Sequence, residues 1–590
     1  MKRQPAILFL LTILAACNGD AVTEPSTMPA ESATPAVSAV PTEPLEPAVT
    51  ATPTFLPTPT ILLRTGPYPL ASYDGTTLSV EDCDYGGYFQ SIEATNPNTV
   101  TFTLCKPDPA FLYKIALNAF AIYPKEWIEA TSGAEFRTPE GLEKPIGTGP
   151  YRVGEWKRGE SITFIKNPDY WGYAPSPVES LVFRWSPDPA QRLQALQSGA
   201  IDGYDGVSAN EIAAIKADPT LQLASRLGLN VFYIGLINTF APFDNLKVRQ
   251  AIAMGIDRQH IVDAFYPPGS EAASHFTPCS ILYGCAGDAW YEFDVHAART
   301  LLVQAGYAGG FQTKLFYRDV IRDYQPQVSK VAQDIQAQLK ENLNINVESV
   351  PVESNAFIKG INSGRFDGLY LHGWSAAYPH ITNFLDNRFS RNSLQFGSAF
   401  PEIYDNMIAG AQSSIPAEAE KYYMDANNAI RKFVPVIPIA HAGSAVAYRA
   451  DVENPQVSPL AIEVFSYARP GNRNAFTWMQ EAEPNSLFCA DETDVESLRA
   501  CAQVMEGLYA YEVNGTAIKP ALATECLPDA EQTIWICTLR QGVSFHDGSE
   551  LDSSDVVATF NMALNPGSPN HKGSTNLWET YDSLWDLMWK

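Results

Sequence analysis

Three segments of the chain place their apolar side chains in the pattern of a β-strand. They are Thr99–Leu104, Ser161–Lys166 and Gln532–Leu539. The first two alternate apolar with polar residues, and the third carries Trp535 between Ile534 and Ile536. Because successive side chains of a strand point to opposite faces, the alternation predicts strands that bury one face.

Five other segments have the pattern of helices. They are Asp188–Ser198, Lys247–Gly255, Val295–Ala305, Gln327–Leu339 and Ser553–Phe560. In the first, Leu193 and Leu196 recur at helical spacing, and Ser553 is expected to be the N-cap of the last. Strands that alternate with helices predict an α/β protein with open sheets and crossover connections.

The N-terminus has the features of an export signal. Lys2 and Arg3 precede an apolar run, Ala6–Ile13, which is too short to cross a bilayer as a helix. Leu14-Ala15-Ala16-Cys17 resembles the lipobox of bacterial lipoproteins, in which the cysteine thiol carries a diacylglycerol; an ordinary signal peptide with a chance cysteine is the alternative. Residues 1–17 therefore predict a lipoprotein that is held on a membrane by lipid at Cys17 and does not span it.

Residues 18–64 are rich in Pro, Thr, Ala, Ser and Glu and contain few large apolar side chains. Such a segment cannot bury enough apolar surface to offset the entropy of ordering, so we expect a disordered tether. About 510 residues of the 590 remain, too many for one hydrophobic core, and they predict two or three domains.

The charge of the chain limits its partners. With 66 acidic against 40 basic residues the formal net charge is −26. Nucleic-acid binding is not expected, because neutralising phosphates needs clustered Lys and Arg. The negative net charge also disfavours direct adhesion to anionic lipid headgroups.

Eight cysteines remain once Cys17 is assigned to lipid, and an even number in an exported chain indicates disulfides. Proximity along the chain favours four bonds, although one or two free buried thiols are the alternative. The favoured pairs are Cys83 with Cys105, Cys279 with Cys285, Cys489 with Cys501, and Cys526 with Cys537. Neither a metal site nor a cofactor is expected, because no Cys-x-x-Cys or His-x-x-x-His spacing accompanies the cysteines.

The body of the chain carries a series of short motifs. They are Gly147-Thr148-Gly149-Pro150-Tyr151, Asn167-Pro168-Asp169-Tyr170-Trp171, Pro242-Phe243-Asp244-Asn245, Val248-Arg249-Gln250-Ala251-Ile252, Gly255-Ile256-Asp257-Arg258, Gly364-Arg365-Phe366-Asp367 and Gly373-Trp374. Together these motifs resemble the family 5 extracytoplasmic solute-binding proteins, the oligopeptide- and dipeptide-binding receptors of ATP-driven (ABC) importers. The resemblance continues to about Pro470.

The tail of the chain resembles the opening of the same family. Its motifs are Glu483-Pro484-Asn485-Ser486-Leu487, Glu506-Gly507-Leu508-Tyr509, Lys519-Pro520-Ala521-Leu522-Ala523 and the stretch from Leu539 to Gly548. This order implies a circular permutation, with the new joint at Arg469–Arg473. A tandem array of two receptors, cut short, is the alternative.

The resemblance implies a fold of two lobes of the periplasmic-binding-protein type (type II), with an extra small α+β domain and a ligand cleft between the lobes. The expected ranges are 150–229 with 450–511 for lobe 1, 230–449 for lobe 2, and 79–149 with 512–590 for the extra domain. The new termini would then lie in the extra domain, away from cleft and hinge.

The resemblance also implies the ligand site. In the peptide receptors an Asp three residues after a Trp holds the α-ammonium of the bound peptide. This chain has Trp374 but Ala377 at that place, which puts N-terminal recognition in doubt and gives a sugar or a blocked peptide more weight. The expected ligand-binding residues are Trp374, Gly373, Ser375, Ala377, Tyr378, Glu483, Asn485, Ser486, Tyr233 and Asn238.

Enzymatic motifs are lacking. His546-Asp547 has the order of a metal phosphohydrolase pair, but one pair supplies too few ligands, and a turn before a helix is the favoured interpretation. The resemblance instead implies a monomeric, extracytoplasmic binding protein, on the periplasmic or cell-surface side of the cytoplasmic membrane. It would deliver an oligopeptide or related solute to an ABC permease and its ATPase subunits. A receptor that reports ligand occupancy to a signalling partner is the alternative.

Overall fold

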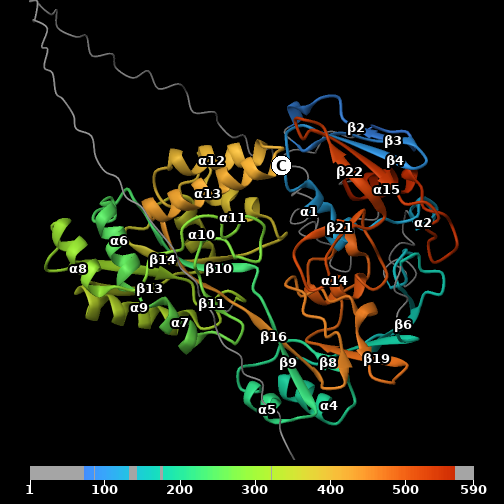
Figure 1. Cartoon of the computed structure of the whole chain (residues 1–590), viewed down its shortest axis with the longest axis horizontal. Helices are drawn as coiled ribbons and strands as arrows, with labels where there is room; N and C mark the ends of the chain where they lie inside the picture. Colours follow the sequence, from blue (N-terminus) through green and yellow to red (C-terminus); the bar gives the residue numbers. More distant parts are fainter. Residues whose placement is uncertain (1–71, 86, 132–142, 173–176, 321, 565–590) are drawn as a thin grey trace, which may run out of the picture. The chain divides into compact units, whose positions relative to one another are not determined.

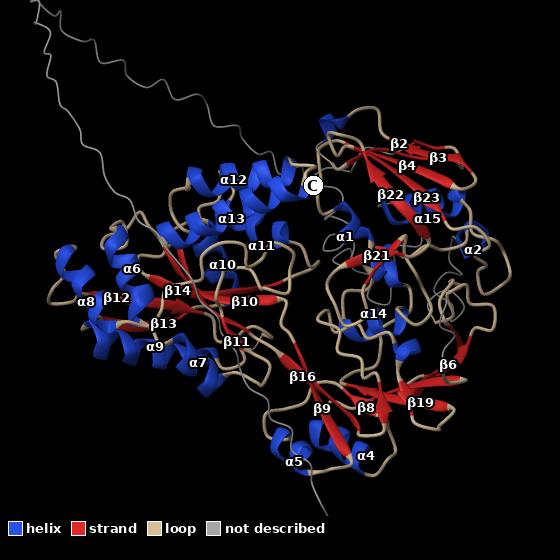
Figure 2. Ribbon diagram, viewed as in Figure 1, coloured by secondary structure: helices blue, strands red, loops and turns tan. Residues whose placement is uncertain are grey.

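The computed structural model describes residues 72–85, 87–131, 143–172, 177–320 and 322–564, all within one compact unit. The expected export signal with Cys17 and the expected tether lie outside these residues. Among the described helices, none combines the length and the apolar character that crossing a bilayer requires. Three large sheets, flanked by helices, make up the described part (Figures 1 and 2).

The first sheet joins strands from both ends of the described chain. Its order is β1 (Ser72–Tyr73), β2 (Thr77–Ser79), β3 (Phe89–Asn96), β4 (Thr99–Leu104), β23 (Ile534–Leu539) and β22 (Ala523–Pro528). The predicted alternation is confirmed: β4 buries Val100, Phe102 and Leu104. In β23, Trp535 is buried while both flanking isoleucines are exposed. The antiparallel pairing of β4 with β23 makes the tail an integral part of this sheet.

Helix α15 (Ser553–Leu564) packs against this sheet, and its Phe560 ring contacts those of Phe89 and Phe102. The helix is predicted correctly, but Ser553 does not act as its N-cap. The Asp552 carboxylate accepts from the Ser554 amide, and the Asp555 carboxylate accepts from the Asp552 amide. The two carboxylates thus form a reciprocal capping box, and the Ser553 hydroxyl donates to the Asn96 carbonyl instead.

The second sheet has the order β5 (Tyr151–Lys157), β6 (Ser161–Lys166), β7 (Ser180–Trp185), β19 (Ala475–Gln480), β8 (Gly203–Tyr204), β16 (Ser444–Arg449) and β9 (Leu221–Arg226). Strand β19, from the tail, lies between β7 and β8 and runs parallel to both. The predicted strand Ser161–Lys166 is confirmed as β6. The domain ranges expected from the resemblance remain a prediction, but β16 pairs with β8 and β9 of this sheet, whereas those ranges placed its residues in lobe 2.

The third sheet has the order β11 (Glu271–Ala272), β15 (Val436–His441), β10 (Asn230–Leu236), β14 (Leu369–Ser375), β12 (Gln312–Tyr317) and β13 (Asn346–Pro351). Every residue of β10 is buried, as expected of a central strand between covered faces. Helices cover both sides, with α7 and α9 on one and α12 and α13 on the other (Figures 1 and 2). The helices of this region are α6 (Leu246–Gly255), α7 (Arg258–Phe265), α8 (Val295–Gln304), α9 (Val328–Leu343), α10 (Ser354–Asn362), α11 (Ile381–Phe389), α12 (Pro401–Gln412) and α13 (Pro416–Phe433).

The other helix predictions are confirmed to within a few residues. The segment predicted at Asp188–Ser198 forms α4 (Pro189–Gln197), and the Asp188 carboxylate caps it by accepting from the Ala190 amide. Asn245 caps α6 and Asp294 caps α8 in the same way. The remaining elements are α1 (Phe111–Ile115), α2 (Lys125–Thr131), α5 (Ile212–Ala217), α14 (Val495–Cys501), β17 (Val452–Glu453), β18 (Arg469–Pro470), β20 (Tyr509–Tyr511) and β21 (Ile518–Pro520), and short 3₁₀ turns at 83–85, 118–120, 465–467 and 489–491.

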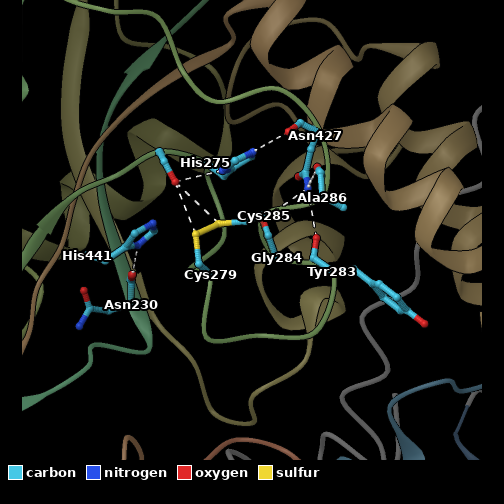
Figure 3. The surroundings of a disulfide bond; sticks show 11 residues. Asn230, His275, Cys279, Tyr283, Gly284, Cys285, Ala286, Asn427 and His441 are labelled. Carbon is cyan, nitrogen blue, oxygen red and sulfur yellow. Dashed lines mark hydrogen bonds between the residues drawn. A yellow bond between two sulfur atoms is a disulfide. The ribbon is translucent and has the colours of Figure 1, made fainter. Parts of the chain in front are cut away.

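Four disulfides join the same cysteine pairs that proximity along the chain favours. They are Cys83–Cys105, Cys279–Cys285, Cys489–Cys501 and Cys526–Cys537. The last links β22 to β23 at directly paired positions. Figure 3 shows the Cys279–Cys285 bond with His275 near it. The Ser274 hydroxyl lies 3.1 Å from His275 Nδ1 and 3.5 Å from Cys279 Sγ. All four close short loops, so each stabilises its own segment of the fold.

Candidate functional site

A cavity of about 620 Å³ opens where β14 ends, beside the third sheet. Its wall includes Arg318, Tyr324, His372, Gly373, Trp374 and Arg388. Gly373 permits a close approach here, because a Cβ at this position would meet the Tyr324 ring at 2.2 Å. The volume lies in the range of small-molecule pockets. Of the expected ligand-binding residues, Gly373, Trp374 and Ser375 line this cavity.

Trp374 is held from two sides. Its indole Nε1 donates to Asn383 Oδ1 at 2.8 Å, and the guanidinium carbon of Arg388 lies 4.3 Å from the centre of its ring. The ring is only half-buried and contributes to the cavity wall. Ser375 donates its hydroxyl hydrogen to Asp323 Oδ2 at 2.5 Å. This side of the cavity is therefore built from a fixed aromatic ring and a hydrogen-bonded rim.

Two neighbouring residues, His372 and Tyr233, face each other across β14 and β10. Burial lowers the pKa of His372 well below its ordinary value, and the guanidiniums of Arg388 and Arg318 lower it further. The imidazole is therefore neutral at physiological pH. Tyr233 is fully buried, and burial raises the pKa of its hydroxyl, which stays protonated. Tyr233 does not itself line the cavity.

Ala377 and Tyr378 do not line this cavity. Ala377 lines a separate space of about 300 Å³ together with Leu117, Leu460 and Leu498. Its amide donates to Asn383 Oδ1 at 3.2 Å, so the same side chain holds Trp374 and the loop after β14. Tyr378 is buried in the core that includes the first two sheets. The surroundings of Ala377 are thus largely apolar.

The other four expected residues make structural contacts. Asn238 accepts from the amide and hydroxyl of Ser398 at 2.8 and 2.9 Å. Glu483 accepts from Trp156 Nε1 at 2.9 Å and from the Gly159 amide, in the turn between β5 and β6. Ser486 is fully buried and donates to Glu492, and the Asn485 amide donates to Ser497 Oγ at 2.8 Å. None of the four lines the Trp374 cavity.

Sequence reasoning missed the cations of this cavity. Arg318 and Arg322 follow β12, and Arg388 lies on α11. Two arginines within five residues after an apolar strand are a signal that could have drawn attention to the first pair. Arg388 gives no such signal, because an arginine in an amphipathic helix ordinarily faces water.

Two clusters that could be taken for metal sites, His546 with Asp547 and His275 with two cysteines, have structural roles instead. His546 lies in a turn, where its Nε2 is 3.1 Å from the Gly149 carbonyl oxygen and the Asp547 carboxylate accepts from the Ser549 amide. The arrangement is that of a turn before a helix, which is the interpretation that the sequence analysis favoured. His275, Cys279 and Cys285 place their ligand atoms within 4.8 Å of one another, but the two sulfurs are bonded to each other (Figure 3). A disulfide sulfur is not the thiolate that metals bind.

Comparisons with known proteins all point to one family of bacterial solute-binding proteins. The family model described as "Bacterial extracellular solute-binding proteins, family 5 Middle" matches residues 71–395 and 517–582. Di/tripeptide-binding protein 1 of Pseudomonas aeruginosa is 30% identical over 381 residues, which cover 63% of this chain and 70% of that protein. Heme-binding protein A of Haemophilus influenzae is 29% identical over 383 residues, which cover 64% of this chain and 69% of that protein.

Among solved structures, that of HbpA2 from Haemophilus parasuis superposes with a TM-score of 0.59 at 29% identity. The match covers 65% of this chain and 75% of the other. The mixed α/β fold with several sheets agrees with such two-lobed binding proteins of type II, as the sequence predicted. Proteins of this group bind solutes, which agrees with the expected non-enzymatic role.

Proposed function

Because the chain belongs to the bacterial extracellular solute-binding proteins of family 5, we propose that it is the substrate-binding component of an ABC importer. It captures an oligopeptide or a related small solute in a cleft between two lobes and delivers it to a membrane permease driven by ATPase subunits. Lipid at Cys17 anchors the protein to the outer face of the cytoplasmic membrane. Residues 18–64 are a tether that lets the binding domains extend away from the membrane surface. The protein acts as a monomer.

The observation that carries this proposal is the cavity beside Trp374. It combines an aromatic wall with several polar groups in a volume suited to a small solute, as ligand sites commonly do. The relatives support a small organic ligand, since one is a di/tripeptide-binding protein and another a heme-binding protein. Closure of the lobes over the bound solute would exclude water and present the loaded form to the permease.

A circular permutation is part of the same proposal. Strands β19, β22 and β23 of the tail lie inside sheets whose other strands precede residue 450, which supports a tail that completes the domains of the body. A permuted order is tolerated when the old termini are close and the new cut is exposed. Joining Lys590 to about Val80 and reopening the chain near Gly471 should give a folded binder. An unfolded product would favour the truncated tandem array instead.

Identification of co-purifying solute tests the ligand class. The full chain would be purified in mild detergent without denaturation, and its ligands released and identified by native mass spectrometry. A ladder of peptide masses would support an oligopeptide receptor that holds its ligand without a carboxylate at position 377. A single non-peptide mass would contradict the peptide assignment.

The second candidate, a non-peptide solute such as an oligosaccharide, is favoured by one observation. Ala377 offers no carboxylate to a peptide ammonium, and it lines a largely apolar space. A buried ammonium without a partner would cost several kcal/mol, about 3 to 5 when one member of a buried pair is missing. Competition by free and N-acetylated dipeptides separates the cases. A receptor for a non-peptide solute binds neither dipeptide, whereas a peptide receptor that ignores the ammonium binds both equally.

A further inference from the structure

A second cavity, of about 400 Å³, lies apart from the Trp374 cavity. Every described residue of its wall precedes residue 173 or follows residue 455, so none belongs to the third sheet or to the helices that cover it. The wall includes the chain after β6, the segment 456–467 and the hairpin of β20 and β21. It shares three residues with the 300 Å³ space beside Ala377, which are Asn118, Leu460 and Ile462. A ligand here would therefore occupy a different part of the molecule from a solute beside Trp374.

Four aromatic residues line this second cavity, and their polar ends are bonded within the protein. Glu506 accepts from the Tyr170 hydroxyl at 2.9 Å and from Trp171 Nε1 at 2.7 Å. On the hairpin, the Tyr509 hydroxyl accepts from a backbone amide of β22 at 3.0 Å, and the Tyr511 hydroxyl donates to a backbone carbonyl of α1. Because the hydroxyl and indole groups are already used, the rings offer an occupant mainly apolar surface.

Two cations border the same cavity, each beside an aromatic ring. The guanidinium carbon of Arg540 lies 4.6 Å from the centre of the Trp171 ring, and Lys519 Nζ lies 5.7 Å from the centre of the Tyr467 ring. Both cationic residues are half-buried, and neither forms an ion pair with a carboxylate of the described residues. They flank one short segment, because Arg540 Nε donates to the Ala521 carbonyl at 3.1 Å and Lys519 lies two residues before Ala521.

The two carboxylates of the wall do not pair with these cations. Burial raises the pKa of the Glu506 carboxyl, while its hydrogen bonds and the charge of Arg540 oppose this rise. Glu512 is exposed and lies at the turn of the hairpin. An uncharged occupant would leave Arg540 and Lys519 without a partner, whereas an acidic group would accept a charge-assisted hydrogen bond from either.

We propose that this cavity is a second ligand site for a small organic acid, whose aromatic or aliphatic body packs on the Tyr170 and Trp171 rings while its acidic group accepts from Arg540 and Lys519. The volume lies near the lower end of the range for small-molecule pockets, which suits a body the size of an indole ring or a short acyl chain. The inference goes beyond the proposed function, because it requires neither an interlobe cleft nor an importer.

Calorimetric titration of the full chain, freed of endogenous solute, tests the inference. Indole-3-acetate and indole-3-acetamide differ by one charge at nearly constant shape, octanoate replaces the ring by an acyl chain, and acetate has the acidic group alone. We expect indole-3-acetate to bind roughly tenfold more tightly than the amide, the difference that one charge-assisted contact makes, and acetate to bind far more weakly than either larger acid. Tighter binding of octanoate than of indole-3-acetate would identify an acyl chain as the body.

Arg540→Gln removes the charge but keeps a polar side chain, so it should abolish the preference for the acid over the amide. Arg540→Lys should retain part of the preference. Arg388→Met is the matched control, since it removes the arginine beside the other tryptophan, and it should leave the preference unchanged. Ala510→Phe adds a ring to the wall from β20 and should weaken the binding of acid and amide alike. Urea midpoints show which variants are folded, and Arg540→Gln decides the question even if Ala510→Phe is not.

The results separate this inference from the proposed function. A preference for the acid that is lost in Arg388→Met and kept in Arg540→Gln would place the acid beside Trp374 and overturn the second site. Equal affinity of the wild type for acid and amide, or failure of all four probes to bind, would overturn it as well. A ladder of co-purifying peptides obtained together with either result would leave the peptide receptor standing. Conversely, an Arg540-dependent preference would support the second site whatever the Trp374 cavity binds.

Discussion

Two buried arginines, Arg388 and Arg499, show how differently the same side chain is used in two regions of this protein. Both lie near a tryptophan, with guanidinium carbons 4.3 Å from the Trp374 ring and 5.7 Å from the Trp478 ring. Arg499 is fully buried and fully engaged, whereas Arg388 is 4% exposed and has no ionic partner among the described residues. The contrast separates a cation that builds the scaffold from one that is available to a ligand.

The partners of Arg499 come from segments far apart in the chain. Its Nε donates to Glu463 at 2.7 Å, its Nη1 to Gln480 at 3.1 Å and its Nη2 to Asp205. Glu463 also accepts from Arg226. Helix α14, which carries Arg499, is thereby tied to residues of the second sheet and to the segment around Glu463. Such a network fixes the arrangement of its segments, because every charge in it has a partner.

The largest expected effect is the loss of this network. Arg499→Met leaves Asp205 without its cation and Glu463 with only one, and removing one member of a buried pair typically costs about 3 to 5 kcal/mol. Urea denaturation followed by tryptophan fluorescence should show a large fall in the unfolding midpoint. The matched substitution Arg388→Met should lower it little or raise it. Equal destabilisation by the two substitutions would remove the distinction between the two arginines.

A second prediction concerns Glu492, which lies near the tail segment expected to line the cleft. It is buried, and burial raises its pKa from the ordinary value of 4.5 to about 8. Between these values the unfolded chain releases a proton that the folded protein keeps. Stability from this group is therefore complete below pH 4.5 and is lost as the pH rises to about 8.

Glu492→Gln removes this dependence. The variant should match the wild type near pH 5 and exceed it near pH 8, by on the order of 1 to 3 kcal/mol. Urea midpoints measured across this range give the comparison, and Glu525→Gln, at an exposed position of β22, is the control. A difference between Glu492→Gln and wild type that does not grow with pH would show that Glu492 is ionised in the folded protein.

The local elements were predictable because they depend on neighbouring residues. Alternation in β4 and β6 and helical spacing in α4 marked their segments, and short separations favoured the disulfides. The site was only partly predictable. Trp374 lines a cavity, but the orientation of Ala377 and the engagement of Glu483 by Trp156 depend on packing between distant segments. Likewise, no sequence pattern distinguishes Arg388 from a surface arginine, because its burial without an ionic partner is a property of the folded chain.

The smallest expected effect is that of replacing Asn383, which holds the Trp374 ring beside Arg388. Asn383 Oδ1 accepts from Trp374 Nε1 and from the Ala377 amide, so it positions the ring that contacts Arg388. Asn383→Ala should cost about 1 kcal/mol of stability, the usual net worth of such hydrogen bonds, because the half-buried indole N–H loses its acceptor but can reach water. Asn355→Ala, an exposed position on α10, serves as the control in the urea titration.

Asn383→Ala should also weaken binding of the solute, because Trp374 lines the cavity and loses the acceptor that holds its ring. The affinity for a dipeptide such as Ala-Gln should fall by a factor of about three to ten, since the aromatic wall is then less fixed. Calorimetric titration of the variant against the wild type gives this ratio, and Asn355→Ala should leave it unchanged. An unchanged affinity of Asn383→Ala would show that the position of the Trp374 ring contributes nothing to binding.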